Sequence, residues 1–261
     1  LELTMTVLSV NVNKIALLRN SRLGNTPSVL GAARIAIAAG ARGITVHPRP
    51  DQRHIRPNDV TELAAMLRSD YPGIEFNIEG NPFAGARDNG YPGFDTMIEQ
   101  TRPDQVTLVP DSDQQLTSDH GWNLGGDLAP LAERIRRYHL LGARVSLFMD
   151  PEPEMIDRAP SVNADRIELY TGPFAATVSR WGLDDPRSLA VLDTYRVAAR
   201  HARTLGLGVN AGHDLDRLNL QLFQRIPDID EVSIGHALVA DALELGLDAT
   251  VRAYCALLTP A

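Results

Sequence analysis

The sequence predicts one α/β domain over residues 1–261, a (β/α)8 TIM barrel with extra short helices. Eight short runs rich in Val and Ile alternate with longer segments of helical periodicity, and 261 residues suit a single barrel of about 250 residues. No shift in composition marks a boundary between domains. The expected strands are Met5–Val12, Gly43–His47, Ile74–Glu79, Gln105–Val109, Arg144–Met149, Arg166–Tyr170, Gly208–Ala211 and Glu231–Ile234.

The segments between these runs have the spacing of amphipathic helices. In one of them, Leu128, Leu131, Ile135 and Tyr138 form a single apolar stripe. Glycine follows several of these segments just before the next strand, as at Gly142, and it tolerates the left-handed conformation that ends many helices. The expected helices are Val29–Ala39, Pro57–Ser69, Gly93–Thr101, Asp127–Leu141, Glu152–Ala159, Arg187–Leu205, Asp216–Arg225 and Ala237–Leu258, the last broken near Gly246.

An open, doubly wound parallel sheet is the main alternative fold. Such sheets bind dinucleotides through a G-x-G-x-x-G fingerprint that follows the first strand. Here the first strand ends in Val10-Asn11-Val12-Asn13-Lys14, which lacks that fingerprint. The barrel is therefore the favoured prediction.

Composition and charge exclude several classes of protein. The 25 Lys and Arg against 33 Asp and Glu give a net charge of −8, which is too acidic for binding nucleic acid through bulk charge. No run of about 18 apolar residues is present to span a membrane, and the segment from Leu1 to Val12 lacks the features of a signal peptide. Cys255 is the only cysteine, so no internal disulfide is expected. We expect a cytoplasmic protein that binds neither nucleic acid nor membrane.

Polar residues gather at the expected carboxyl ends of the strands, which form the active face of a barrel. They are Asn11, Asn13, His47, Arg49, Glu79, Asp150, Glu168, His213 and His236. Histidine titrates near neutrality, and a carboxyl between apolar neighbours can have a raised pKa. The set therefore predicts acid–base catalysis. For Glu168, a buried ion pair with an arginine such as Arg49 is the alternative.

Phosphate is the expected handle of the substrate. The segment Ser233-Ile234-Gly235-His236-Ala237 leads from the last strand into a helix, where backbone amides can bind an anion and Gly235 permits close approach. Arg49 can form two hydrogen bonds to one phosphate. Arg53 and Arg56 either serve the same face or belong to a solvated basic loop. The polar segment 111–119 has the composition of a lid, with an ordinary surface loop as the alternative.

Several stretches of the chain carry a resemblance to a known family. Among them are Gly43-Ile44-Thr45-Val46-His47-Pro48-Arg49, Asn77-Ile78-Glu79, Val209-Asn210-Ala211-Gly212-His213 and Ile234-Gly235-His236-Ala237. They follow one another in family order over nearly the whole chain, and their combination is highly specific. The chain resembles the pyridoxine 5′-phosphate synthases of the deoxyxylulose-dependent vitamin B6 pathway.

The resemblance implies a barrel enzyme that condenses 1-deoxy-D-xylulose 5-phosphate with 3-amino-2-oxopropyl phosphate. The products are pyridoxine 5′-phosphate, inorganic phosphate and water. It implies that His47 and Glu79 accept protons, that His213 donates a proton and that Glu168 stabilises a transition state. The implied contacts to the aminoketone phosphate are Asn11, Arg22, Gly235 and His236, and those to the deoxyxylulose phosphate are Arg49, His54 and Thr117.

The resemblance also bears on cofactors and assembly. It implies that neither a cofactor nor a metal takes part. It also implies that the binding partners are small phosphorylated molecules. The family assembles as a homo-octamer, a tetramer of dimers, in which the arginine at the Arg22 position can serve a neighbouring subunit's site. We therefore expect an octamer here.

Three residues depart from the family's pattern. Asn13 and Lys14 stand where many members have Asp and His, and Asp214 stands where many have Gly. We assign these three residues to substrate binding, with contacts that differ from those of the family. The catalytic positions are intact.

Three other functions compete with this one. Lys14 is the only lysine, so a Schiff-base aldolase, the main alternative, would have to use it. A metal-dependent hydrolase is disfavoured because Asn11 and Asn13 are poor zinc ligands. A non-catalytic phosphate-binding protein would not need His47, Glu79 and His213 together.

Overall fold

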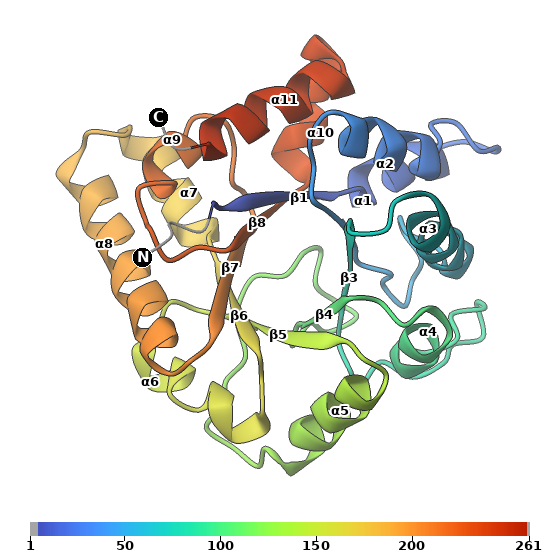
Figure 1. The fold of residues 1–261 in the computed structure, drawn as a ribbon, viewed down its shortest axis with the longest axis horizontal. Helices are drawn as coiled ribbons and strands as arrows, with labels where there is room; N and C mark the ends of the chain where they lie inside the picture. Colours follow the sequence, from blue (N-terminus) through green and yellow to red (C-terminus); the bar gives the residue numbers. More distant parts are fainter. Residues whose placement is uncertain (1–4, 260–261) are drawn as a thin grey trace.

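The computed structural model describes residues 5–259, which form a closed barrel of eight parallel strands surrounded by helices (Figure 1). Each strand pairs with its neighbours in chain order, and β8 closes on β1. The strands are β1 Val7–Asn11, β2 Gly43–Val46, β3 Glu75–Gly80, β4 Gln105–Leu108, β5 Arg144–Met149, β6 Arg166–Tyr170, β7 Gly208–Gly212 and β8 Glu231–Ile234. The predicted barrel and its eight strands are confirmed. One domain over residues 1–261 stays a prediction, because residues 1–4 and 260–261 lie outside the described part.

Helices cover the outside of the barrel, as the ring around the central strands in Figure 1 shows. Within residues 5–259, no helix combines the length and the apolar composition that crossing a bilayer requires. The helices are α1 Asn13–Asn20, α2 Val29–Ala38, α3 Pro57–Asp70, α4 Phe94–Thr101, α5 Ala129–Leu140, α6 Pro153–Ile156, the 3-10 helix η1 Ala159–Val162, α7 Gly172–Trp181, α8 Pro186–Thr204, α9 Leu220–Phe223, α10 His236–Leu245 and α11 Leu247–Leu258.

Two helices were not predicted from the sequence. Helix α1 begins two residues after β1. Because no polar turn separates the two elements, the periodicity of the helix could not be distinguished from that of the strand. Helix α7 starts at Gly172-Pro173, a pair of residues that usually signals a turn, although proline suits the first turn of a helix. The sequence analysis placed only one helix between β6 and β7, where the structure has α7 and α8.

Two expected helices are shorter than predicted, and one break is confirmed. The region 152–159 contains only α6 and the start of η1. Helix α9 does not reach back to Asp216, because the Asp216 carboxylate accepts hydrogen bonds from the amides of Leu218 and Asn219 and forms a turn there. Gly246 separates α10 from α11 with a φ of +79°, which glycine adopts without strain.

The interior of the barrel is polar, and the hydrophobic core lies between the strands and the helices. The hydroxyls of Ser9 and Thr45 lie 2.7 Å apart, Asn77 donates to Thr45 Oγ1 at 3.4 Å, and Thr107 donates to Asn77 Oδ1 at 3.1 Å. Alternate residues of the same strands are apolar and buried, as expected when successive side chains point to opposite faces. The outer set includes Val10, Ile44, Ile78, Val106 and Leu147.

A buried ion pair joins helices α1 and α3 beside the carboxyl end of the barrel. Arg19 on α1 donates from both terminal nitrogens to the Asp59 carboxylate on α3, with Nη2 2.9 Å from Oδ2. The same guanidinium donates to the carbonyl oxygen of His54 at 3.2 Å. Both charged side chains are less than 10% exposed, with values of 6% and 9%. The pair therefore positions the loop that carries His54.

Removing the acidic partner is expected to destabilise the whole fold. Asp59→Ala leaves the Arg19 charge buried and unpaired, which lowers the free energy of unfolding by roughly 3–5 kcal/mol. Urea unfolding measures this change. Asp70→Ala is the matched control, because Asp70 pairs with Arg34 at 2.8 Å with side chains 40% and 46% exposed. The control should move the midpoint little, and equal effects of the two variants would contradict the role of burial.

Candidate active site

A cleft of about 340 Å³ opens at the carboxyl ends of the strands. Every residue that was assigned a catalytic or binding role lines it except Arg22. The set comprises His47, Glu79, Glu168, His213, Asn11, Asn13, Lys14, Arg49, His54, Thr117, Asp214, Gly235 and His236. The closed barrel explains this convergence, because each residue lies at or after the end of a parallel strand. Asp150, which was also expected at this face, does not line the cleft and accepts a hydrogen bond from the Gly121 amide at 3.0 Å.

Two asparagines, at the end of β1 and the start of α1, hold the neighbouring catalytic candidates. Asn13 Oδ1 accepts a hydrogen bond from the backbone amide of His47 at 2.9 Å, and the Asn13 amide donates to Asn11 Oδ1 at 3.0 Å. Asn11 Nδ2 lies 3.5 Å from Glu79 Oε2. A Cβ on Gly235 would lie 3.0 Å from the Asn11 side chain, so Gly235 lets the two segments approach closely. The Asn13 carboxamide thus fixes the backbone beside His47.

His47 and Glu79 form the closest pair of titratable groups of opposite kind in the catalytic set. His47 Nδ1 lies 3.8 Å from Glu79 Oε2, and the side chains are 8% and 13% exposed. Burial lowers the pKa of His47 well below its usual value, and the nearby charge of Arg49 lowers it further. Burial raises the pKa of Glu79 to about 8, and Asp111 adds to this effect while Arg49 opposes it. At neutral pH the proton therefore resides on Glu79, and His47 is free to accept one.

Glu168 lies deeper in the site, and its pKa is raised as well. Its residue is 3% exposed, and burial followed by the charge of Glu79 raises its pKa well above the usual value. Gly212 makes room for it, because a Cβ there would lie 2.3 Å from Glu168 Oε1. Among residues 5–259, Glu168 Oε2 has no hydrogen-bond partner. The alternative of an ion pair between Glu168 and Arg49 is wrong, since Arg49 binds another carboxylate.

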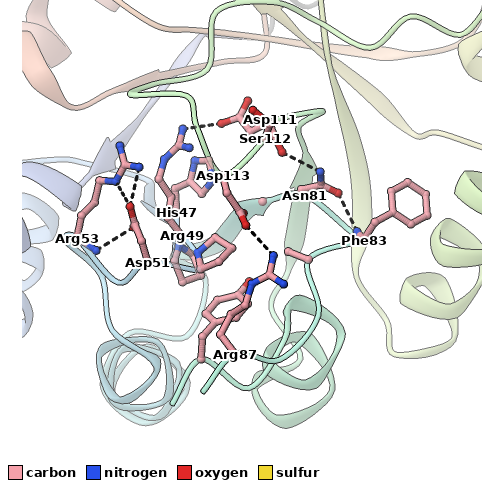
Figure 2. Close-up of a pocket in the computed structure, with 15 residues that line it drawn as sticks. His47, Arg49, Asp51, Arg53, Asn81, Phe83, Arg87, Asp111, Ser112 and Asp113 are labelled. Carbon is pink, nitrogen blue, oxygen red and sulfur yellow. Dashed lines mark hydrogen bonds and ion pairs between the residues drawn. The ribbon is translucent and has the colours of Figure 1, made fainter. Parts of the chain in front are cut away.

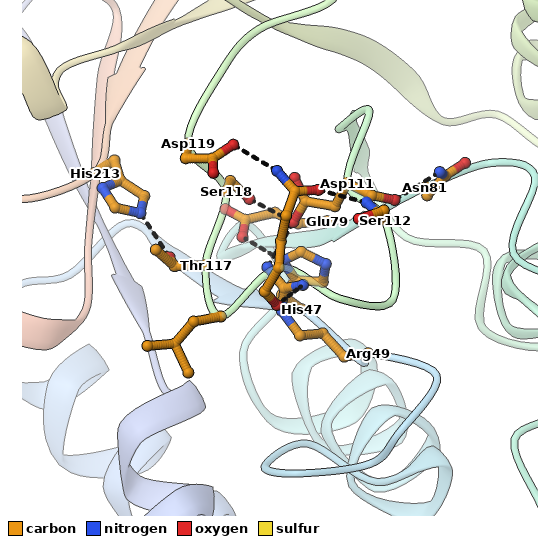
Figure 3. Close-up of polar contacts among 12 residues, drawn as sticks. His47, Arg49, Glu79, Asn81, Asp111, Ser112, Thr117, Ser118, Asp119 and His213 are labelled. Carbon is orange, nitrogen blue, oxygen red and sulfur yellow. Dashed lines mark hydrogen bonds and ion pairs between the residues drawn. The ribbon is translucent and has the colours of Figure 1, made fainter.

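That carboxylate is Asp111, which the sequence places after the fourth strand, at the start of segment 111–119, but to which the sequence analysis gave no role in binding or catalysis. Arg49 Nη2 donates to Asp111 Oδ2 at 2.5 Å, and Ser118 Oγ donates to the same oxygen at 2.7 Å (Figure 3). Both side chains of the pair are buried, at 7% and 4% exposed. Asn81 Nδ2 donates to the Asp111 carbonyl at 2.8 Å. The loops after β2, β3 and β4 are thereby joined around Arg49.

A smaller cavity of about 250 Å³ adjoins the cleft behind Arg49 (Figure 2). His47, Arg49 and Arg53 line both spaces. Arg53 pairs with Asp51 at 2.6 Å and donates to the carbonyl of Leu116 at 3.0 Å. Arg53 therefore belongs to the site rather than to a freely solvated loop.

His54 is a neutral hydrogen-bond donor to the cleft. Burial lowers its pKa to about 3, and the charges of Arg49 and Lys14 lower it further. Its Nδ1 accepts a hydrogen bond from the amide of Ile55 at 2.9 Å. The neutral ring must then carry its proton on Nε2. His54 can donate that hydrogen to an anionic ligand.

The segment 111–119 reaches across the cleft to the opposite side. Thr117 Oγ1 lies 2.7 Å from His213 Nε2, although the two residues are 96 positions apart in the chain (Figure 3). Leu116 and Ser118 line the cleft next to Thr117. The segment thus covers part of the cleft, and its opening and closing as a lid stays a prediction.

Arg22 lies apart from the other predicted residues. It follows α1 in a fully exposed stretch and does not line the cleft. Nothing in the sequence pattern around it could have indicated this separation. Among the described residues, no group of three His, Cys, Asp or Glu side chains is arranged to hold a metal ion.

The chain matches one protein family over almost its full length. Residues 8–260 fit the family described as pyridoxal phosphate biosynthesis protein PdxJ. The pyridoxine 5′-phosphate synthase of Xanthomonas axonopodis pv. citri (strain 306) is 56% identical over 250 residues, which are 95% of each chain. That of Xanthomonas campestris pv. campestris (strain B100) is 58% identical over 254 residues, 97% of this chain and 96% of the relative. These similarities confirm the resemblance seen in the sequence.

Solved structures with low sequence identity share the fold. An aldolase described as 4-hydroxy-2-oxoglutarate aldolase/2-deydro-3-deoxyphosphogluconate aldolase from TTHB1 superposes with a TM-score of 0.56 at 16% identity, over 97% of this chain and 94% of that one. Phosphoribosyl anthranilate isomerase from Thermus thermophilus superposes with a TM-score of 0.54 at 15% identity, over 97% and 98%. At these identities the likeness supports the barrel alone.

The raised pKa of Glu79 makes a prediction about stability. A carboxyl that titrates at about 8 when folded, against 4.5 as the ordinary value, keeps a proton that the unfolded chain has released. Between these pH values stability therefore falls as pH rises, by at most about 1.4 kcal/mol per pH unit for this group. Glu79→Gln should flatten the decline, as measured by urea unfolding at several pH values from about 5 to about 8.

Glu168 and Glu231, whose pKa values burial also raises, remain in both proteins, so the difference between the two curves reports Glu79 together with its effect on Glu168. Parallel stability curves for the wild type and Glu79→Gln would show that Glu79 ionises normally.

Proposed function

Because the chain belongs to the family of the pyridoxal phosphate biosynthesis protein PdxJ and is a pyridoxine 5′-phosphate synthase, we propose that this cleft condenses 1-deoxy-D-xylulose 5-phosphate with 3-amino-2-oxopropyl phosphate. Pyridoxine 5′-phosphate, inorganic phosphate and water leave it. The assignment rests mainly on one observation. A protonated Glu79 and a neutral His47 lie next to each other, with 3.8 Å between Glu79 Oε2 and His47 Nδ1. Condensation needs a proton donor and a proton acceptor side by side.

Two groups of residues are proposed to hold the two phosphates. Arg49, preset by Asp111, and the Nε2 hydrogen of His54 face one part of the cleft, and Thr117 joins them from the opposite loop. These residues suit the deoxyxylulose phosphate, because a guanidinium and neutral donors together bind a dianion. Asn11, Gly235 and His236 suit the aminoketone phosphate at the start of α10.

The proton transfers are divided among three groups. His47 accepts a proton from the substrate amine as it attacks the ketone. Glu79 gives its proton to the carbonyl oxygen, which becomes a hydroxyl, and His47 returns the proton it took from the amine to that hydroxyl, which leaves as water from a protonated imine. The Glu79 carboxylate later accepts a proton from carbon during ring closure. His213 donates a proton to a leaving group. The opposite pKa shifts of His47 and Glu79 support this division of roles.

Glu168 is proposed to stabilise charge in the transition state. Its carboxyl is buried and its pKa is raised well above the usual value, which favours the protonated form that can donate a hydrogen bond to an oxygen gaining negative charge. The free Oε2 is compatible with that role. No cofactor and no metal enters the proposed reaction.

Lys14 and Asn13 are proposed to adjust substrate contacts, and Asp214 to act at the same face of the cleft. Lys14 lies at the first turn of α1 and lines the cleft, where its ammonium can pair with an anionic ligand. In the alternative function, Lys14 would instead form a Schiff base with a ketone. We favour the synthase because its imine joins the two substrates and needs no enzyme amine.

The assembly is proposed to be a homo-octamer, a tetramer of dimers, in the cytoplasm, with one barrel domain per chain. The full exposure of Arg22, away from the cleft of its own chain, supports its service in a neighbouring subunit's site. The single thiol of Cys255 suits a reducing compartment.

An assay for pyridoxine 5′-phosphate tests the function directly. The purified protein with both phosphorylated substrates should form the product, and Glu79→Gln should lower kcat by at least about 100-fold, as is typical when acid–base catalysis is lost. Asp70→Asn, in an exposed pair far from the cleft, is the control and should keep the wild-type rate. No product from the wild type, or near-normal turnover by Glu79→Gln, would contradict the proposal.

Replacing the only lysine separates the two candidate functions. Lys14→Ala should raise KM more than it lowers kcat, because it removes a substrate contact and leaves the proton-transfer groups in place. Borohydride added with substrate should leave no adduct on the wild-type chain. A covalent adduct on Lys14, or loss of kcat in a folded Lys14→Ala protein, would favour the aldolase.

A further inference from the structure

The turn that carries His213 has an unusual backbone. His213 and Asp214 are consecutive residues with positive φ, +86° and +57°, although neither is glycine. Such conformations cost free energy for residues with a Cβ, and Asp tolerates the left-handed region better than most. Gly at position 214 would adopt it without that cost. The chain therefore keeps an Asp where a glycine would relieve strain.

Hydrogen bonds from neighbouring elements hold this turn in place. Thr171 Oγ1 donates to the carbonyls of Gly212, at 2.7 Å, and of His213. Asn219 Nδ2 donates to the Asp214 carbonyl at 3.0 Å, and the Asn219 residue is 2% exposed. Strain that the surroundings fix in this way is typical of functional sites.

The Asp214 carboxylate lies against the nitrogen of His213 that faces away from Thr117. His213 Nδ1 is 3.1 Å from Asp214 Oδ2, whereas Nε2 is 2.7 Å from Thr117 Oγ1 in the cleft. The distance is that of an ion pair, but the Nδ1 hydrogen is not well aligned with Oδ2, and Nδ1 has no other partner among the described residues. The Asp214 carboxylate is thus the group placed to accept a hydrogen bond from His213 Nδ1.

The charges around Asp214 keep it ionised. The contact with the His213 ring lowers the pKa of Asp214 most, burial opposes this, and the neighbouring His236 and Lys14 side chains lower the pKa further. Lys14 and Asp214 thus place opposite charges in the same cleft. The edge of the Tyr170 ring, 5.2 Å from the His213 ring between centroids, limits its rotation.

We propose that Asp214 is a positioning residue for His213, holding the hydrogen on Nδ1 so that the proton donated to the substrate is the one on Nε2. In the step, the ring starts as the imidazolium with a hydrogen on each nitrogen; the Nε2–H bond breaks as the leaving oxygen takes the proton, and the neutral ring that remains keeps its hydrogen on Nδ1, against Asp214. This role deepens the proposed function and rests on it. Asp214 does not need to touch the substrate.

Substitutions at Asp214 separate this role from a backbone or a substrate contact. Asp214→Gly relieves the positive φ, so its Tm should equal or exceed that of the wild type, while kcat falls about 10- to 100-fold, as when the partner that orients a functional histidine is lost. Asp214→Asn, which keeps the shape and removes the charge, should also lower kcat more than it changes KM. Asn163→Gly, at an exposed residue with φ of +60°, is the control and should keep the wild-type kcat.

A coupling test shows whether Asp214 acts through His213. In the His213→Ala background, Asp214→Asn should have almost no further effect on kcat. Wild-type kcat in Asp214→Gly, a loss confined to KM, or independent effects of the two substitutions would overturn the proposal.

A measurement without substrate separates this proposal from the function itself. The 15N resonances of labelled histidine, assigned with His213→Gln, should give the Nδ1–H form of the neutral His213 ring in the wild type and a shift toward Nε2–H in Asp214→Asn. Nε2–H in the wild type would overturn the role of Asp214 even if pyridoxine 5′-phosphate is formed. Absence of product with an Nδ1–H ring would instead contradict the function.

Discussion

The site depends on the removal of one carboxyl and one imidazole from water. The register of β2 with β3 pairs Val46 with Ile78, so the residues that follow, His47 and Glu79, come side by side. Burial disfavours the charged form of both groups, which shifts their pKa values in opposite directions. The closed barrel therefore fixes not only the distance between the two groups but also which of them carries the proton.

The loops around this pair provide the positive charge of Arg49 for a phosphate, and Asp111 pairs with that arginine. Arg49 is buried and would be costly there alone, and Asp111 offsets its charge before any ligand is bound. Ser118 joins the same carboxylate, so the segment that covers the cleft is tied to the arginine. A phosphate that reaches Arg49 meets a guanidinium already oriented, which reduces the entropy cost of binding.

The architecture and most of the site could be predicted from the sequence. Strand runs and their polar ends are local patterns, and a parallel barrel brings all carboxyl ends to one face, so His47, Glu79, Glu168 and His213 could be grouped without coordinates. Two helices were missed by the same reasoning. Helix α1 follows β1 almost directly, and α7 begins with a Gly-Pro pair that usually indicates a turn.

Contacts between loops could not be predicted in this way. The pairing of Arg49 with Asp111 links residues 62 positions apart, and the wrong alternative, an ion pair with Glu168, was equally compatible with the pattern. The left-handed backbone at Asp214 and its approach to His213 depend on Thr171 and other distant residues. Such features are set by tertiary packing, which periodicity does not encode.

The protonation state of Glu79 tests the central claim most directly. Infrared difference spectra between the wild type and Glu79→Gln, recorded without substrate as pH rises from about 6 to about 10, follow this one carboxyl. The structure predicts a protonated carboxyl at pH 6 that ionises near pH 8. An ionised carboxylate already present at pH 6 would contradict the arrangement in which Glu79 holds the proton and His47 accepts one.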